Sequence, residues 1–151
     1  MSWTGNHIAT SFKKQLLEMK HDFRVGGHTF FLALYTEDAV LTAGTANYST
    51  ANEVVGTGYT AGGAQLTQVS PVISATSAFA DFADLVFSTV TLTGDNAAFG
   101  GIIYNKTTGG GSGTTDAVAI LDFGGGQFRT AANLTVVFPT ADSLNAIVLI
   151  K

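Results

Sequence analysis

The residues whose spacing most resembles a reaction site form a glycine-rich segment, Gly56-Thr-Gly58-Tyr-Thr-Ala61. It matches the pattern G-x-G-x-x-A, in which the pyrophosphate of a dinucleotide lies at the N-terminus of a helix. That mechanism needs a helix to begin at these glycines. The chain continues instead with Gly62-Gly63 and then a strand-like sequence interrupted by Pro71. The segment therefore predicts turns in which glycine supplies a positive φ, and we expect no nucleotide site.

Histidine is the next candidate for chemistry, as a metal ligand. All three histidines, His7, His21 and His28, lie near the N-terminus. His21 and His28 lack the i, i+4 spacing of a helical zinc pair, and the chain has no cysteine to complete a site. We expect no metal and no cofactor, and we interpret the histidines as solvated or helix-end side chains.

Carboxylates could support hydrolysis if two of them faced each other across a cleft and the pKa of one were shifted. Asp81 and Asp84 are three positions apart, and Glu37 is adjacent to Asp38, but neither context indicates such a cleft. Asp122 lies in Ala-Ile-Leu-Asp-Phe-Gly, which predicts a hydrogen-bonding residue at a strand end. The same Asp-Phe-Gly spells a kinase metal motif, but the rest of the kinase set is missing.

A nucleophilic serine is not indicated either. The chain has no Gly-x-Ser-x-Gly elbow, and the run Gly-Gly-Ser-Gly at 110–113 belongs to a glycine-rich loop too loose to strain a nucleophile. None of these motifs therefore indicates catalytic chemistry.

Composition indicates a protein that packs against others. Hydrophobic residues make up 46% of the chain and charged residues only 12%, whereas about 25% is typical of soluble domains. A surface so poor in charge has little self-repulsion. An ordinary β-domain with a threonine-rich face is the alternative. The 151 residues fit one domain that needs no disulfide, and the absence of cysteine fits a protein made in a reducing cytosol.

Charge is unevenly distributed along the chain. Residues 1–24 carry four cations and two carboxylates, a net charge of +2, and the remainder carries a net charge of −6. A net acidic body argues against nucleic acid as the partner.

No apolar run reaches the roughly 18 residues of a membrane span, and the N-terminus lacks the layout of a signal peptide, so we expect no membrane association.

The N-terminal region is predicted to be a polar arm, residues 1–10, followed by a helix over 11–24. Trp3 and Ile8 are the apolar exceptions in the arm, and Trp3 either docks into a neighbour or folds back on its own domain. In the helix one apolar stripe is expected, with Ser11 or Thr10 as the cap and Gly26-Gly27 as the stop. The stripe residues recur at i, i+4, i+7 and i+11: Phe12, Leu16, Met19 and Phe23.

After Gly27 the pattern changes to short strands separated by turns. Strands are predicted over 29–36, 64–74, 77–82, 86–92, 97–105, 117–123, 134–138 and 146–150, with a turn at 124–126. In 86–92 the alternation puts Phe87 and Val90 on opposite faces, and Pro71 favours an edge position or a strand start. The predicted fold class is mainly β: one domain over 11–151, an antiparallel β-sandwich or small barrel with one short N-terminal α-helix.

Several segments recur together in one known family. They are Phe12-Lys-Lys-Gln-Leu-Leu with His21-Asp-Phe, Leu32-Ala-Leu-Tyr-Thr, the segment 48–63 with Asn52-Glu-Val-Val-Gly-Thr-Gly-Tyr, then Tyr104-Asn, 118–124 and Phe138-Pro. From about residue 11 to residue 151 the chain thus resembles a family of small virion structural proteins of tailed bacteriophages. The match over 48–63 is the specific one. The chain departs from the family in having Phe87 in place of a tryptophan and Ala98-Phe-Gly-Gly in place of an Ala-Arg-Gly start.

The resemblance implies a non-enzymatic virion component, assembled in the cytoplasm of the host bacterium. The foremost expectation is a capsid decoration, or cement, protein. It would stabilise the head lattice by contacting the major capsid protein and neighbouring copies of itself, as a homo-oligomer, with a trimer as one option. The alternative is a tail-associated adhesin or fibre module that binds a host surface ligand. A polysaccharide-degrading tail enzyme is a third class, disfavoured for want of a carboxylate pair.

The contact elements are expected in the basic N-terminal region and in two loops. The loops are 37–47 and 107–115. The candidate contact side chains are Trp3, Ile8, Phe12, Lys13, Lys14 and Lys20.

Overall fold

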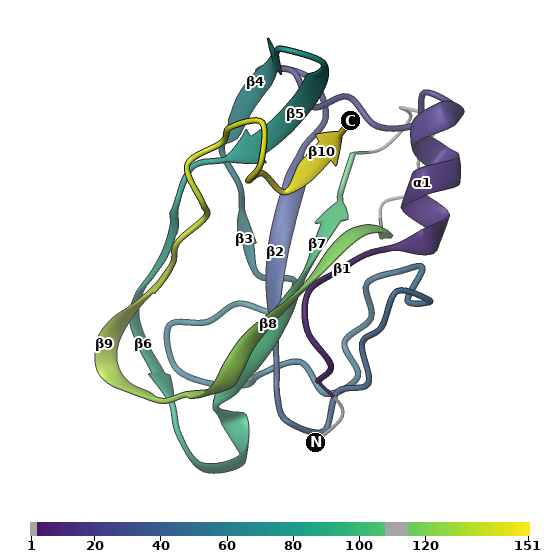
Figure 1. The fold of residues 1–151 in the computed structure, drawn as a ribbon. Coiled ribbons are helices and arrows are strands. Elements are labelled where there is room, and N and C mark those ends of the chain that lie inside the picture. The colour runs from purple at the N-terminus through teal and green to yellow at the C-terminus, as the bar shows by residue number, and fades with distance from the viewer. Residues whose placement is uncertain (1–2, 108–114) are drawn as a thin grey trace.

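The computed structural model describes residues 3–107 and 115–151. In these ranges the chain is mainly β with antiparallel strands and one short N-terminal α-helix, which confirms the predicted class (Figure 1). Most of the predicted contact loop 107–115, including the Gly-Ser run, lies outside the described residues. The elements are β1 His7–Ile8, α1 Thr10–Leu17, β2 Phe30–Tyr35, β3 Ala64–Gln65, β4 Gln68–Ser74, β5 Ser77–Phe82, β6 Leu85–Leu92, η1 Gly94–Asn96, β7 Ala98–Asn105, β8 Asp116–Gln127, β9 Arg129–Val136 and β10 Val148–Ile150.

The strands form three antiparallel sheets that do not close on themselves, so the arrangement is sandwich-like and not a barrel. The largest sheet has the order β1-β8-β7-β2-β3, the second has the order β10-β5-β4, and β6 pairs with β9. Figure 1 shows the β6–β9 pair at one side of the molecule and α1 at the other, with β2, β7 and β8 between them. β4 is an edge strand, which is one of the two positions that Pro71 favoured.

One hydrophobic core connects the three sheets. The near-continuous apolar run of β2 is buried because β7 and β3 flank it and other elements cover its faces. A chain of aromatic rings then crosses the molecule: Phe23 stacks on Phe30 at 4.6 Å, and Phe82 lies 5.6 Å from Phe30 and 6.1 Å from Phe138. These contacts join the segment after α1, the large sheet, the second sheet and the segment after β9.

Residues 3–9 do not form the predicted polar arm but fold back on their own domain, which was the second of the two alternatives for Trp3. The Trp3 ring is buried, and its Nε1 donates a hydrogen bond to the Thr36 carbonyl at 3.2 Å. The ring occupies space left by Gly100, where an added Cβ would lie 2.3 Å from it. Ile8 lies in β1, which pairs with β8. The chain folds back because an indole buried against its own sheet gains apolar contact and keeps its N–H bonded.

The observed helix is shorter than the predicted one over 11–24, with eight residues in place of fourteen. α1 ends at Leu17, and Met19 comes soon after it with φ 58° and an exposed side chain, so the Gly26-Gly27 pair does not end the helix. Phe12 and Phe23 are both buried, but Phe23 reaches the core from a loop. The predicted cap is also wrong: Ala9 is the N-cap, and Ser11 Oγ has no hydrogen-bond partner within the described residues.

Two bulges change the predicted strands. In β6, Thr89 has φ 52°, and the register shifts between Phe87 and Val90, so both of these side chains are buried although simple alternation placed them on opposite faces. In β8, the expected turn at 124–126 is absent. The strand continues to Gln127 through a bulge containing Gly124, whose φ is 74°.

Candidate interaction surfaces

The segment 48–63, the most specific part of the sequence pattern, is organised around one buried carboxylate. Glu53 accepts hydrogen bonds from the Tyr48 hydroxyl at 2.7 Å, the Tyr59 hydroxyl at 2.6 Å and the Gly62 N–H at 2.6 Å. Tyr104 stacks on Tyr48 at 4.5 Å and donates its hydroxyl proton to the Gly62 carbonyl at 2.8 Å. A buried carboxylate is stable when its oxygens are satisfied in this way. This network folds the loop onto the large sheet.

The glycines of this segment serve turns and close backbone approach. Gly58, Gly62 and Gly63 have positive φ, which confirms the turn prediction, and no helix begins here among the described residues. A Cβ on Gly63 would lie 1.8 Å from the Leu32 carbonyl oxygen, and one on Gly56 would lie 2.1 Å from the Thr91 carbonyl oxygen. No role for Glu53 was predicted from the sequence. The one signal for it was a pair of tyrosines, five positions before it and six positions after it.

Asp122 and Asp84, two of the other singled-out carboxylates, are also structural. Asp122 accepts the Gly5 N–H and the Gly124 N–H at 2.8 Å each, which confirms a hydrogen-bonding role, although β8 extends past it. Asp84 accepts the Phe138 N–H at 2.8 Å. Asp81 is buried, and burial raises the pKa of its carboxyl above the ordinary range. Asp122 and Asp84 thus each position a different stretch of backbone.

His21 is neither solvated nor at a helix end, contrary to the sequence interpretation. Asn105 Nδ2 lies 3.0 Å from His21 Nδ1 and 2.9 Å from His28 Nδ1 and donates one N–H to each ring. His21 Nε2 donates to the Gln15 side-chain oxygen at 2.9 Å. Burial lowers the pKa of His21 to about 4; the Asp116 charge opposes this, and His28 and Lys20 reinforce it. The hydrogen bonds from Asn105 to His21 and His28 connect the loop after α1 to the end of β7.

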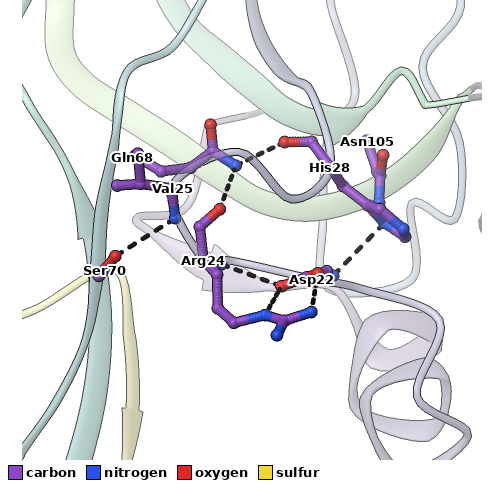
Figure 2. Close-up of polar contacts among 7 residues, drawn as sticks. All are labelled: Asp22, Arg24, Val25, His28, Gln68, Ser70 and Asn105. Carbon is purple, nitrogen blue, oxygen red and sulfur yellow. Dashed lines mark hydrogen bonds and ion pairs between the residues drawn. The ribbon is translucent and has the colours of Figure 1, made fainter.

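Figure 2 shows how the loop 22–28 is fastened to the edge strand β4. The Gln68 amide donates to the backbone carbonyls of Arg24 and His28, and the Val25 N–H donates to Ser70 Oγ at 3.2 Å (Figure 2). Within the loop, Arg24 Nε and Nη2 lie 2.9 and 2.7 Å from the two Asp22 oxygens. The Arg24 guanidinium lowers the pKa of Asp22 to about 2. The loop is therefore held in one conformation beside the second sheet.

The predicted contact residues divide into buried and exposed sets. Trp3 and Phe12 are buried in the core, and Ile8 is half-buried in β1, so the two aromatic rings are not available to a partner. Lys13 and Lys14 are exposed on α1. Lys14 and Lys20 both pair with Glu18, at 3.3 and 3.2 Å. The lysines thus give α1 and the turn after it a polar, basic rim.

An exposed apolar surface lies between α1, the loop 22–28 and the second sheet. Ile73 of β4 and Ile150 of β10 both pair with Ala78 of β5, so the three side chains form one row across one face of the sheet. Ile73 is 78% exposed and Ile150 54%. Beside this row is a shallow groove of about 290 Å³, lined by residues of all three elements: Leu16, His21, Asp22, Phe23, Arg24, Pro71, Ala78, Phe79, Ala80, Val148 and Ile150.

We define the basic apolar face as this groove and row together with their exposed neighbours. The apolar neighbours are Leu17 and Met19, which come just after the groove residue Leu16, and Val25, whose N–H is bonded to β4. Five cations lie in the same segments, against Glu18, Asp22 and Asp81: Lys13, Lys14, Lys20, Arg24 and Lys151. A preformed apolar patch with a charged rim is the usual anatomy of a protein-binding surface.

A second groove, of about 490 Å³, lies between β1–β8 and the segment from β9 to Ile147. Its walls are mostly apolar. Several of its polar side chains already have partners within the protein: Asn6 accepts the Asp122 N–H, His7 Nε2 lies 3.1 Å from Thr4 Oγ1, and the Gln127 amide donates to Gly125.

No protein-family model, curated protein or solved structure matches this chain. Among the residues that the structure describes, no three histidine, aspartate or glutamate side chains gather as a metal-ion site. In the same residues no helix combines the length and apolar character needed to cross a membrane.

Proposed function

We propose that this chain is a non-enzymatic structural protein of a tailed-phage virion, and that it decorates the capsid and stabilises the head lattice. The family resemblance of the sequence supplies the virion setting. The observation that carries the proposal is the exposed row Ile73–Ala78–Ile150 on a chain with 12% charged residues. A contiguous apolar surface of this kind is costly to leave in water and is buried at interfaces.

The geometry around the row fits a lattice component. The loop 22–28 is held by Gln68, Ser70 and the Asp22–Arg24 pair, so little conformational entropy is lost when a partner binds (Figure 2). On a capsid, modest contacts of this kind are repeated many times by symmetry. The partners in this proposal are the major capsid protein and neighbouring copies of the same chain.

The second groove favours a different candidate function. A concave, mostly apolar cavity of about 490 Å³ is within the size range of small-ligand sites. It supports the alternative of a tail-associated adhesin that binds a host surface ligand. Against this alternative, Asn6, His7 and Gln127 in the groove are already hydrogen-bonded within the protein, so fewer groups remain to orient a sugar.

A co-sedimentation experiment distinguishes the two candidates. The purified chain is mixed separately with phage heads produced without it and with cells of the host bacterium. Saturable retention on heads, with no adsorption to cells, is the expected result for a capsid decoration protein. Adsorption to cells without retention on heads would overturn the proposal in favour of the adhesin. Retention on neither would remove both.

A further inference from the structure

A second surface of the molecule is complementary to the basic apolar face. We define the acidic end as Glu37, Asp38, Val40, Val55 and Asp95. Val40 is 70% exposed and Val55 74%. Three loops meet there: the Asn52 amide donates to the Asp38 carbonyl at 3.2 Å, and the Val55 N–H donates to Asn96 Oδ1 at 3.1 Å. The acidic end thus presents two apolar side chains among three carboxylates.

The two surfaces lie at opposite ends of β2. Phe30 begins the strand and stacks on Phe23 of the groove, whereas Tyr35 ends it just before Thr36 and the acidic end. Six residues at about 3.3 Å each place the two ends of β2 roughly 20 Å apart. One copy can therefore use both surfaces at once.

The two surfaces also differ in charge. The segments that form the basic apolar face carry Lys13, Lys14, Lys20, Arg24 and Lys151 against Glu18, Asp22 and Asp81, a net charge of +2. The acidic end carries three carboxylates and no cation. A molecule polarised in this way attracts the opposite end of another copy more strongly than the same end.

We infer that the basic apolar face of one copy binds the acidic end of a second copy, so that the chain associates head to tail. The apolar row Ile73–Ala78–Ile150 and its groove receive the protruding valines, and the lysine rim faces the carboxylates. Such a contact is heterologous, and its repetition gives rings or open arrays, not a closed twofold dimer. The inference deepens the proposed function by naming the partner of this face, and it rests on that function for its biological setting.

Two variants test the inference, and each has one of the two surfaces disrupted. The variant I73D/I150D places carboxylates in the basic apolar face, and V40K/V55K places cations in the acidic end. The matched control is L144D, which puts the same carboxylate on an equally exposed apolar side chain, 72% exposed, that belongs to neither surface. Thermal unfolding of each variant verifies that it is folded before association is measured.

Sedimentation velocity of the free protein, measured over a rising concentration at low and at high salt, gives its state of association. Wild type and L144D are expected to form species larger than the monomer. Their association constant is expected to be at least tenfold lower in high salt. Each end variant alone is expected to stay monomeric. Their equimolar mixture is expected to form a 1:1 dimer and nothing larger, because only one intact junction remains.

The inference is overturned if wild type stays monomeric at all concentrations, if either end variant still self-associates, or if the mixture forms no dimer. These results are independent of the proposed function. Head-to-tail association of a protein that phage heads do not retain would leave the inference standing and remove the capsid role. Retention on heads by a protein that remains monomeric in solution would do the reverse.

Discussion

The Tyr59 hydroxyl lies 2.6 Å from Oε1 of Glu53 and donates its proton to that buried carboxylate. The same hydroxyl accepts the Leu34 N–H at 2.9 Å, so one side chain connects the loop to the backbone of β2. Burial and the neighbouring Glu53 charge raise the pKa of Tyr59 well above its usual range, which keeps the hydroxyl a donor. The segment with the most specific sequence pattern therefore stabilises the fold by holding its loop against β2.

Replacing Glu53 is expected to destabilise the fold. In Glu53→Gln the carboxamide keeps only one acceptor oxygen. Its NH₂ group, itself a donor, faces tyrosine hydroxyls that in the wild type donate to the carboxylate. Loss of charge-assisted hydrogen bonds in a buried site is expected to lower the free energy of unfolding by about 2 kcal/mol. Urea unfolding at pH 7.5 measures it. Asp95→Asn, at an exposed carboxylate, is the control and is expected to change stability by less than about 0.5 kcal/mol. Equal effects in the two variants would contradict the role given to Glu53.

Gly63 and Gly26 form a matched pair for the close approach of the loop to β2. Their φ angles are nearly equal, +79° and +81°, but a Cβ at Gly63 would lie 1.8 Å from the Leu32 carbonyl oxygen, whereas one at Gly26 would meet nothing within 4 Å. Gly26→Ala is expected to cost about 1–2 kcal/mol, from backbone strain alone. Gly63→Ala is expected to lose more than about 3 kcal/mol or to fail to fold. Similar melting temperatures for the two variants would refute the close packing.

Acid is expected to destabilise the protein through His21. The pKa of His21 in the folded state is about 4, below the ordinary value of 6.5, so between these values the unfolded chain binds more protons. The contribution of His21 is therefore complete above about pH 6.5 and is lost as the pH falls toward 4, at up to about 1.4 kcal/mol per pH unit and roughly 3 kcal/mol in total.

NMR titration of the His21 ring and urea unfolding between pH 7.5 and 4.5 check this expectation. The variant His21→Asn is expected to lose part of the stability at pH 7.5 and also part of the dependence on pH. A ring that titrates near 6.5 in the folded protein, or an unchanged pH dependence in the variant, would show that His21 is not held neutral by burial.

Trp3 is expected to contribute to stability and not to partner binding. Its ring is buried against Gly100, and its indole N–H is bonded to Thr36. Trp3→Ala is expected to lower the free energy of unfolding by about 3–5 kcal/mol. The neighbouring exposed residue gives the control, and Thr4→Ala is expected to cost less than about 0.5 kcal/mol. If Trp3→Ala melted like wild type, the N-terminal segment would be the free arm that its polar sequence suggested.

The strands could be predicted from sequence where local patterns decide them. β2, β5 and β7 agree with their predicted ranges to within one residue at each end, because an uninterrupted apolar run or a clear alternation marks each one. The phase of β6 could not be predicted. Its bulge depends on the Thr89 N–H bonding to Asn133 Oδ1, a residue 44 positions away in β9.

The prediction of a helix over 11–24 was wrong for the same physical reason. The apolar spacing of Phe12, Leu16, Met19 and Phe23 is helical, but the chain leaves the helix after Leu17 and brings His21 to Asn105, 84 positions away. Such long-range hydrogen bonds leave no mark in local sequence. The candidate contact residues Lys13 and Lys14 are exposed side chains of α1. The apolar row Ile73–Ala78–Ile150 emerges only when β4, β5 and β10 pair.

The copy number of this protein in purified virions is the most direct test of the capsid role. Quantitative mass spectrometry compares its peptides with those of the major capsid protein in the same particles. We expect on the order of hundreds of copies per particle, because a decoration protein follows the symmetry of the head lattice. A count of only a few to a few tens would contradict the capsid role and indicate a tail component, and absence from the particles would remove the virion assignment altogether.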